Sequence, residues 1–424
     1  MRVLVIGSGA REHALAWAIH RSPKKSALYC APGNGGTADI AENIPLDIMD
    51  FAQCAEWAAK HAIELTVIGP DNPLGEGIVD VFQQRGLRVF GPTKAAARIE
   101  SSKSWAKDLM QRYGIPTARA ATFDDLDAAR RYLASGECSY PLVIKADGLA
   151  AGKGVSIVSS RQEAEATLTA FMAECRLGNA GKRVLLEEYL KGPEVSFFAL
   201  SDGQTMLPLM PACDYKRALD GDEGPNTGGM GAYSPPGFVN ERQTQQIIQT
   251  ILQPTIDAMA KEGCPFIGVL YAGLMLTDDG PKVLEFNARL GDPETQVVLP
   301  CLQSDLLELL LAACEQRLAG MSITWQSQAA SGVVLASNGY PESYQTGFPI
   351  SGLDQLPPDM LAFHAGTRRR EDGQYVTSGG RVLTLVALGR DVASARARVY
   401  QEINRVQFQG SRYRRDIAAR EERG

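Results

Sequence analysis

Short apolar runs alternate with helical segments along the first hundred residues. The runs at 3–6, 27–31, 65–68 and 87–90 each end in a turn rich in glycine or proline. After the first turn the apolar residues take on helical spacing, at 14–19. Strands that end in polar turns are typical of an open parallel sheet, with its ligand crevice at the carboxyl ends of the strands.

The middle of the chain has a different pattern. Residues 122–191 are predicted to form a small α+β unit that is inserted in a larger body. The segment 213–235 is predicted to lack regular structure because it is rich in glycine and charge. A helix is predicted at 103–113, and short strands continue into the last hundred residues. The elements expected in these regions lie at 141–145, 155–158, about 161–175, 184–189, 332–336 and 382–387.

The composition of the chain limits the classes of protein to which it could belong. The chain has 424 residues, 45% of them hydrophobic, and a net charge of −6, which is ordinary for a globular protein of two to four domains. Without a long basic run, nucleic acid is not an expected partner. Eight cysteines form no CxxC pair, so we expect neither a thiolate metal site nor a disulfide framework, and a reducing cytoplasm fits best. No signal peptide or membrane span is expected.

The first turn, Gly7-Ser8-Gly9, looks like the start of a dinucleotide fingerprint. Its third small residue is replaced by Glu12, and the second apolar run ends in another glycine turn, PGNGGT, rather than an acidic residue. An NAD-dependent oxidoreductase is therefore not expected. The turn keeps a more general property, since amides at a strand-to-helix turn suit a phosphate.

The loop DGLAAGKGV resembles a P-loop but joins two predicted strands. Gly148, Gly152 and Gly154 would let backbone amides lie over phosphate oxygens, and Lys145 and Lys153 would add charge. A solvated hairpin is the alternative. Lys145 favours the phosphate site, because a lysine that ends an apolar strand needs an anion nearby.

Two further segments carry oxygen ligands. In VLLEEYLKGPEVSF, a short linker could pass an adenine, and Glu194 could hold ribose hydroxyls. In VLEFNARLGDPETQ, Glu285 and Asn287 are two apart on a strand and face the same side, which suits Mg²⁺. Arg289 follows as a clamp for a carboxylate or phosphate, ahead of Asp292 in a proline turn. An exposed strand of alternating polar residues is the alternative.

The segment 213–235 offers both signs of charge to a small zwitterionic or phosphorylated substrate. Its candidate residues are Asp214, Lys216, Arg217, Asp220 and Asn226. Disorder is the alternative.

These motifs, in this order, resemble the ATP-grasp superfamily. GSGAREHA, PGNGGT, GPDNPL, DGDEGPNTGGMGAYSP, RLGDPETQ and the final YRRDI extend the likeness, over essentially the whole chain, to the glycinamide ribonucleotide synthetase family. The resemblance implies an N-terminal substrate-binding α/β domain at 1–101, an ATP-grasp region at 102–327 with a lid at about 122–191, and a C-terminal α+β domain at 328–424. It also implies an ATP-dependent ligase of de novo purine biosynthesis, which joins glycine to 5-phosphoribosylamine through glycyl phosphate.

The resemblance implies a ligand for each group of candidate residues. ATP would contact Lys103, Lys145, Gly148, Gly152, Lys153, Gly154, Glu187, Glu188, Leu190 and Glu194. Mg²⁺ or Mn²⁺ would bind Glu285 and Asn287. Glycine and the transferring group would meet Arg289, Asp214 and Asp292. The substrates would also contact Gly9, Asn34, Gly35, Gly36, Asp71, Lys216 and Asn226.

Three residues depart from the family pattern. Ala10 and Asp71 stand where glycine and glutamate are usual, and Tyr215 stands where histidine is common, so no imidazole base is expected in that loop. Another ATP-grasp carboxylate–amine ligase or carboxylase remains an alternative. A non-catalytic nucleotide-binding regulator is a second one, although it would not need the metal pair. The sequence does not give the oligomeric state, and a monomer is compatible with it.

Overall fold

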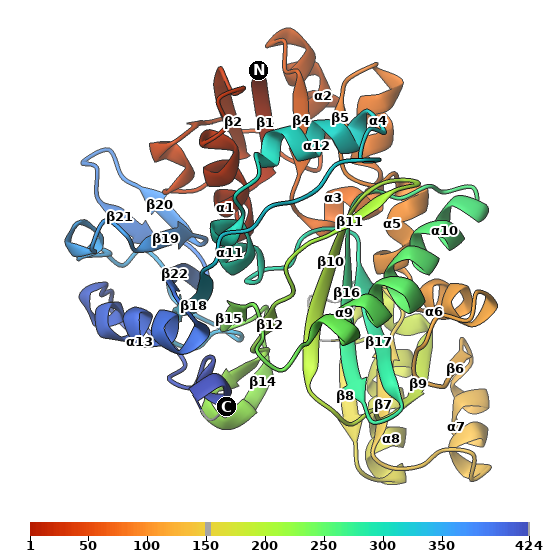
Figure 1. The fold of residues 1–424 in the computed structure, drawn as a ribbon. Coiled ribbons are helices and arrows are strands. Elements are labelled where there is room, and N and C mark those ends of the chain that lie inside the picture. The colour runs from red at the N-terminus through yellow and green to blue at the C-terminus, as the bar shows by residue number, and fades with distance from the viewer. Residues whose placement is uncertain (149–153, 423–424) are drawn as a thin grey trace.

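The computed structural model describes residues 1–148 and 154–422. Its N-terminal part is a five-stranded parallel sheet in the order β3-β2-β1-β4-β5, flanked by helices (Figure 1). The predicted open parallel sheet is confirmed, although the first helix begins at Ala10, ahead of the predicted 14. The strands are β1 Arg2–Gly7, β2 Ala27–Pro32, β3 Glu42–Asn43, β4 Leu65–Ile68 and β5 Val89–Phe90; the helices are α1 Ala10–His20, α2 Phe51–Lys60, α3 Asp71–Glu76, α4 Ile78–Gln84 and α5 Lys94–Ser101.

The strand order reverses at β1, since β2 lies on one side of it and β4 on the other. In such sheets, ligands bind in the crevice at the carboxyl ends of the strands on either side of this point. The turns after β1, β2 and β4 meet there: Gly33 donates its amide to Gly7, and Gly69 donates its amide to Ile6. The polar loop predicted after β4 is wrong in part, because α3 begins at Asp71.

The predicted lid is a four-stranded sheet in the order β6-β9-β7-β8, covered by two helices. It has its own small core, which includes Ile144, Leu168 and Leu186. The helix predicted at about 161–175 is shorter as an α-helix, and continues as a π-helical turn at Thr169–Ala173. The elements are β6 Ala120–Phe123, α7 Leu126–Ala134, β7 Leu142–Ala146, β8 Val155–Val158, α8 Arg161–Leu168 and β9 Val184–Glu188.

The body behind the lid is built on the long antiparallel strands β10, β16 and β17, with β11 at one edge. Figure 1 shows α6, α9 and α10 beside this sheet. The strands are almost wholly apolar on the side that packs on the helices, whereas β17 carries Glu285 and Asn287 at its carboxyl end. The elements are α6 Lys103–Arg112, β10 Glu194–Asp202, β11 Met206–Pro208, α9 Glu241–Ile247, α10 Gln253–Lys261, β16 Ile267–Thr277 and β17 Gly280–Asn287.

The C-terminal sheet has the order β12-β15-β18-β22-β19, and it takes two strands from the middle of the chain. The prediction that 213–235 lacks regular structure is therefore wrong: this segment adds two strands to the sheet and forms a hairpin, β13–β14. The elements are β12 Cys213–Asp214, β13 Arg217–Leu219, β14 Glu223–Asn226, β15 Gly231–Ser234, α11 Thr295–Val298, α12 Leu306–Cys314, β18 Ala329–Ala336, β19 Leu361–His364, β20 Thr367–Arg369, β21 Tyr375–Thr377, β22 Arg381–Gly389 and α13 Val392–Glu402.

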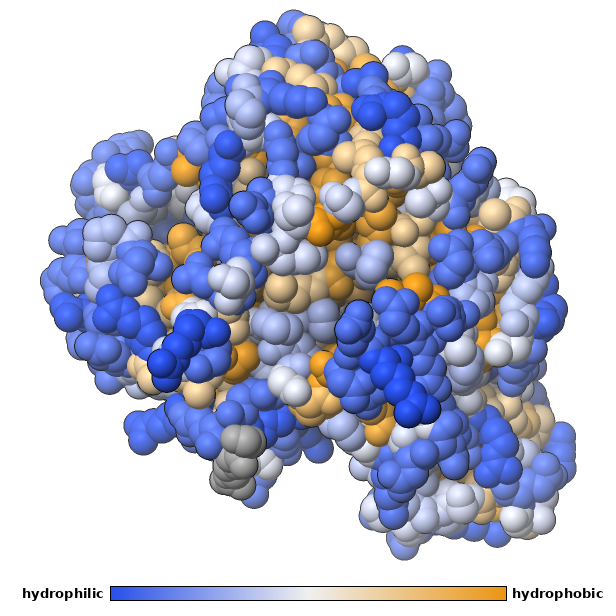
Figure 2. All heavy atoms as spheres, viewed as in Figure 1, coloured by the Kyte–Doolittle hydropathy of each residue, from blue (hydrophilic) through white to orange (hydrophobic). Residues whose placement is uncertain are grey.

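The face of the molecule in Figure 2 is mostly hydrophilic, with apolar residues gathered toward its middle. Across residues 1–148 and 154–422, every helix is too short or too polar to cross a membrane. All eight cysteines lie among the described residues and are free thiols there.

Candidate active site

Glu12 fills the turn after β1. Its carboxylate accepts the amide of Gly9 at 2.7 Å and pairs with Arg11 Nε at 2.6 Å, and the residue is only 2% exposed. A β-carbon on Gly69 would lie 2.7 Å from the Glu12 carboxyl carbon, so the carboxylate lies against both turns. In a dinucleotide site, the amides of this turn bind the pyrophosphate. Here the amide of Gly9 donates to Glu12 and is not free for a ligand, so the turn is unlike a dinucleotide site. The lack of a side chain at Gly9 lets the Glu12 carboxylate lie close to the backbone.

Asn34 fixes the turn after β2. Its side-chain amide donates to the carbonyls of Ser8 at 2.9 Å and His364 at 2.7 Å, and its oxygen accepts the amide of Gly36 at 2.9 Å. The side chain is therefore used within the protein. Asn34 joins the first turn to the C-terminal sheet and shapes the turn that was predicted to face the substrate.

Gly36 lies against two buried histidines, and Gly35 lies against Thr367 and Tyr375. His13 Nδ1 accepts the amide of His364 at 2.9 Å, and Gly35 donates its amide to Thr367. A β-carbon on Gly36 would overlap the His13 ring and would lie 2.7 Å from His364 Cδ2. Burial, followed by the proximity of His364, lowers the pKa of His13 to about 3, and burial lowers the pKa of His364 to about 4. Both rings are neutral at neutral pH, and they join α1 to β19.

The predicted phosphate-binding lysines converge at the base of the lid. Lys103 Nζ donates to the carbonyl of Gly148 at 3.1 Å, and Gly154 accepts the amide of Ala146 at the start of the returning strand. Burial lowers the pKa of Lys103; Glu285 opposes this effect and Lys145 adds to it. Gly152 and Lys153 lie outside the described residues. The two lysines and Glu285 therefore share one electrostatic environment.

Lys145 has a protein anion beside it. Its Nζ lies 2.8 Å from Glu187 Oε2, and Lys107 Nζ lies 3.0 Å from the other oxygen of this carboxylate. Lys145 also donates to the carbonyl of Leu284 at 2.8 Å. Burial alone would raise the pKa of Glu187, but the two lysines hold it below its usual range. The anion that Lys145 requires is thus Glu187, and the three groups together keep one positive charge.

The linker after β9 borders a small apolar surface. Leu190 packs with Ala118 and Met275, beside Leu284. The carboxylate of Glu188 is turned aside, and it accepts the amide and Nε of Arg119 at 3.0 Å each. Of the residues predicted to line adenine, Leu190 is the one placed in this apolar cluster.

Glu285 and Asn287 fit a hard divalent cation. They lie on one face of β17, and burial, which raises the pKa of Glu285, is outweighed by Lys216, Lys145, Lys103 and Arg289, which hold it low. Within the described chain, no group of three or more His, Cys, Asp or Glu side chains could by itself hold a metal. An ionised carboxylate and an amide oxygen leave the remaining positions to water and phosphate, as Mg²⁺ prefers.

Asp214 and Lys216 extend this charged cluster. Lys216 Nζ lies 3.2 Å from Glu194 Oε2, and Asp214 raises the pKa of Lys216 well above its usual value. Burial raises the pKa of Asp214 to about 7, against the effect of Lys216. The structure thus brings Asp214, Lys216 and Glu194 together near Glu285. Asn226 lies elsewhere, on the exposed hairpin β13–β14.

Arg289 is held by a carboxylate from α5. Its Nη2 lies 2.9 Å from Glu100 Oε1, while the other oxygen of Glu100 accepts the amide of Ala288 at 2.8 Å. Burial disfavours the charged guanidinium, but Glu100 and then Asp71 raise the pKa of Arg289 above its usual value. The predicted residues Arg289 and Asp71 are therefore neighbours.

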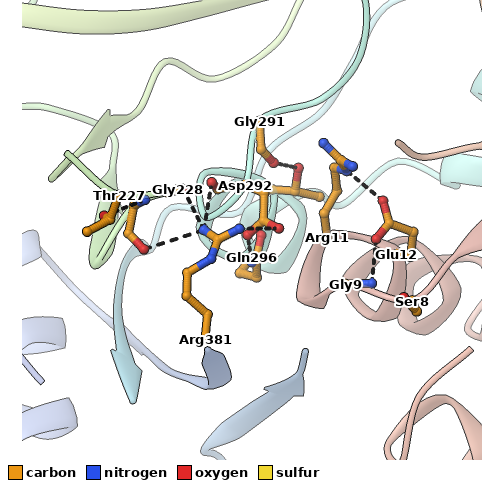
Figure 3. Close-up of polar contacts among 12 residues, drawn as sticks. Ser8, Gly9, Arg11, Glu12, Thr227, Gly228, Gly291, Asp292, Gln296 and Arg381 are labelled. Carbon is orange, nitrogen blue, oxygen red and sulfur yellow. Dashed lines mark hydrogen bonds and ion pairs between the residues drawn. The ribbon is translucent and has the colours of Figure 1, made fainter. Parts of the chain in front are cut away.

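Asp292 lies between the N-terminal turn and the C-terminal sheet (Figure 3). Its Oδ1 accepts Gln296 Nε2 at 2.7 Å, and its Oδ2 pairs with Arg381 at 3.0 Å. A β-carbon on Gly9 would lie 3.4 Å from Oδ2. Asp292 therefore lies between the part of the site that is predicted to bind the substrate glycine and the part that is predicted to bind the sugar amine.

Tyr215 points toward the C-terminal segment. Its hydroxyl accepts the amide of Ala418 at 3.0 Å, and the guanidinium of Arg414 lies 4.8 Å from the ring centre. Burial raises the pKa of Tyr215 to about 12, so the phenol stays protonated at neutral pH. The tyrosine acts in packing the segment that ends in YRRDI.

Sequence reasoning missed Lys107, Glu100 and Arg381. Lys107 could have been found, because it stands four residues after Lys103 and shares its helix face. Glu100 ends α5 with no motif around it. Arg381 is brought in by the pairing of β22 with β18, which no local pattern gives.

Comparison with known proteins agrees with this layout. Family models described as the N, ATP-grasp (A) and C domains of phosphoribosylglycinamide synthetase match residues 1–100, 101–295 and 330–420. The phosphoribosylamine–glycine ligase of Halalkalibacterium halodurans is 50% identical over 422 residues, which cover 99% of this chain and 97% of that protein. A crystal structure of the phosphoribosylamine–glycine ligase of Thermotoga maritima has a TM-score of 0.86 at 36% identity, covering 98% of this chain and 100% of that one.

A biotin carboxylase from Campylobacter jejuni has the same fold, with a TM-score of 0.74 at 15% identity over 97% of this chain and 92% of that one. The fold and the site define an ATP-grasp enzyme. Within that class, the chain belongs to the phosphoribosylglycinamide synthetase family, and the expected resemblance is confirmed.

Proposed function

We infer that this protein is an ATP-dependent ligase that joins glycine to 5-phosphoribosylamine and releases ADP and phosphate, a step of de novo purine biosynthesis. The observation that carries the inference is the place of Asp292. It lies beside the Gly9 turn at the carboxyl edge of the N-terminal sheet, and near Arg289, which follows the strand β17 that bears Glu285. An acyl phosphate formed at β17 would there meet an amine bound at the turn.

The chemistry requires activation, because a carboxylate is a poor electrophile. The glycine carboxylate attacks the γ-phosphorus of ATP, ADP leaves, and glycyl phosphate forms. The sugar amine then attacks the glycyl carbonyl, inorganic phosphate leaves with its bond electrons, and the amine loses a proton. We propose that Lys103 and Lys145 bear charge on the transferring phosphate and that Arg289 orients the glycine carboxylate; the shared environment of Lys103 and Lys145 and the anchoring of Arg289 by Glu100 support these roles.

Glu285 and Asn287 would hold a divalent cation, Mg²⁺ or Mn²⁺, which neutralises phosphate charge when it is bound. We propose that Leu190 contributes to the adenine surface and Glu194 to the ribose contact. Asp71, Lys216 and the turn at 34–36 are proposed substrate contacts, with Asn34 acting through the shape of the turn. The proposal needs no nucleic acid or membrane partner, and the expected cytoplasmic location remains a prediction.

The test is the substrate dependence of ADP release. We expect ADP release only when glycine and phosphoribosylamine are both present, with glycinamide ribonucleotide formed in equal amount. Robust turnover with another amino acid, or without the sugar amine, would instead support a different ATP-grasp ligase. Turnover dependent on bicarbonate would support a carboxylase.

A further inference from the structure

In Figure 3, Arg381 of the C-terminal domain points toward Asp292. It stands at the first position of β22. Its Nη1 donates to the carbonyl of Gly228 at 2.5 Å and to that of Asp292 at 3.0 Å, and its Nη2 pairs with Asp292 Oδ2 at 3.0 Å. A single guanidinium thus binds two segments, the one before β15 and the one after β17.

The glycines before β15 allow this approach. A β-carbon on Gly228 would lie 2.9 Å from Arg381 Cζ, so a side chain there would push the guanidinium away. Gly229 has φ +109°, a conformation that favours glycine, and its missing side chain faces Pro293. The two glycines therefore let the backbone lie directly on Arg381 and on the proline turn beside Asp292.

We propose that Arg381 is a positioning residue for the transfer reaction: it fixes the ionised Asp292 beside the Gly9 turn, so that the C-terminal domain completes the site where the two substrates meet. The proposal rests on the proposed function. It assigns Arg381 no contact with substrate.

The electrostatics of Asp292 support this role. Burial alone would raise the pKa of Asp292, but Arg381, followed by Arg11, the Gln296 hydrogen bond and Arg289, holds it below its usual range. Arg11 faces it from α1, Gln296 from α11, and Arg289 from the end of β17.

Two further carboxylates contribute to the charge around this pair. Burial alone would lower the pKa of Arg381, but Asp292 raises it most, followed by Tyr340, Glu294 and Glu12. Arg381 is the one cation that forms an ion pair with Asp292 among the described residues. Removing Arg381 therefore leaves Asp292 with weaker compensation in a site that also holds two other acids.

The test compares R381Q and R381K with the wild-type enzyme. We expect R381Q to lower kcat/KM for phosphoribosylamine roughly 10- to 100-fold, the effect of losing a charge-assisted hydrogen bond to a buried carboxylate. As the pH is lowered, the kcat/KM of R381Q should begin to fall at a higher pH than that of the wild type, because Asp292 takes up a proton more readily without Arg381. The acid limb of the pH profile thus moves to higher pH. R381K keeps the charge and returns the limb toward the wild-type position.

The matched control is R396Q, which removes another arginine of the C-terminal domain, one on α13 that pairs with Glu422 rather than with Asp292. It should leave the acid limb in place. If Arg381 had a merely structural role, R381Q and R381K would both have a lower thermal stability and contain less active enzyme. The acid limb of the pH profile would then stay in place in both variants.

A double-mutant cycle with D292N decides whether Arg381 acts through Asp292. We expect R381Q to have little further effect in the D292N background. An equal loss in both backgrounds, or an acid limb that does not move in R381Q, overturns the proposal. Wild-type turnover is measured first: its failure to depend on glycine and phosphoribosylamine would contradict the proposed function, whereas an unchanged R381Q contradicts only the role of Arg381.

Discussion

Lys145 and Glu187 form a buried ion pair, with Nζ 2.8 Å from Oε2, at the place where the family resemblance puts ATP phosphates. A simple pair would be neutral and would offer a triphosphate little attraction. Lys107 changes the balance, since it binds the second oxygen of Glu187 and also donates to Thr117 Oγ1 at 2.7 Å and to the carbonyl of Ala118 at 3.2 Å. Its donors are used within the protein, whereas the charge of Lys145 remains available to a ligand.

Replacing Lys107 with methionine should therefore weaken ATP binding. We expect the KM for ATP to rise about tenfold, because the group of three charges becomes neutral. Adding E187Q to K107M restores a net charge of +1 and should recover part of the affinity.

Lys282→Met is the control for K107M, since Lys282 is a partly exposed lysine that lies 3.7 Å from Glu188 rather than beside Glu187. Steady-state kinetics with ATP as the varied substrate measure all three variants. A double variant with weaker ATP binding than K107M alone would contradict this account of Lys107.

Glu285→Gln should lower kcat by about two orders of magnitude or more, because it removes an ionised ligand for a cation that bears charge in the transition state. Asn287→Asp keeps an oxygen ligand and should require less Mg²⁺ for half-maximal rate. Both are checked by titrating Mg²⁺ and then Mn²⁺ at saturating substrates. Near-normal rates for E285Q at every metal concentration would exclude the metal role.

The two buried histidines should make the protein sensitive to acid. In the unfolded chain they bind a proton near pH 6.5, whereas in the folded protein their pKa values are about 3 and 4. The unfolded state thus binds more protons between these limits, so stability falls as pH falls from 6.5 toward 4. The slope is at most about 1.4 kcal/mol per pH unit for each histidine.

Thermal unfolding of His13→Gln across this range should show a smaller dependence on pH than the wild type. His20→Gln serves as control, because His20 is exposed. Equal pH dependence in H13Q and H20Q would argue that His13 does not stay neutral in the folded protein.

Gly36→Ala should raise the KM for phosphoribosylamine more than Gly35→Ala does. The new methyl group would overlap the His13 ring and would lie 2.7 Å from His364 Cδ2, and both rings are buried and cannot move aside easily. At Gly35 the neighbours are Thr367 Oγ1 at 2.9 Å and the edge of Tyr375 at 3.1 Å. Kinetics with the sugar amine varied would distinguish the two, and an opposite order would contradict the predicted shape of the turn.

The sequence predicted the elements that local patterns determine. The strands at 65–68 and 155–158 have the predicted bounds, because each is a short run between clear turn signals. The prediction for the segment 213–235 is wrong, since its strand β15 pairs with β18, a partner far along the chain, and β12 joins the sheet through β15. Composition alone cannot give such a pairing.

The site shows the same division. Burial of Lys145 predicted an anion, but the sequence could not say that the anion is Glu187 rather than phosphate alone. The face shared by Glu285 and Asn287 follows from strand periodicity. The ion pairs of Arg289 with Glu100 and of Asp292 with Arg381 depend on packing between elements from different parts of the chain, and no local rule gives them.

The C-terminal sheet borrows β12 and β15 from the segment before residue 235. Cutting the chain at 327 and 328 would therefore not yield two intact domains. The larger fragment would carry two strands without their sheet, and the smaller one would expose the edge of β18 that β15 normally covers. The part of the chain proposed to bind the nucleotide and the part that carries Arg381 thus share one sheet, and we expect neither to fold properly when expressed without the other.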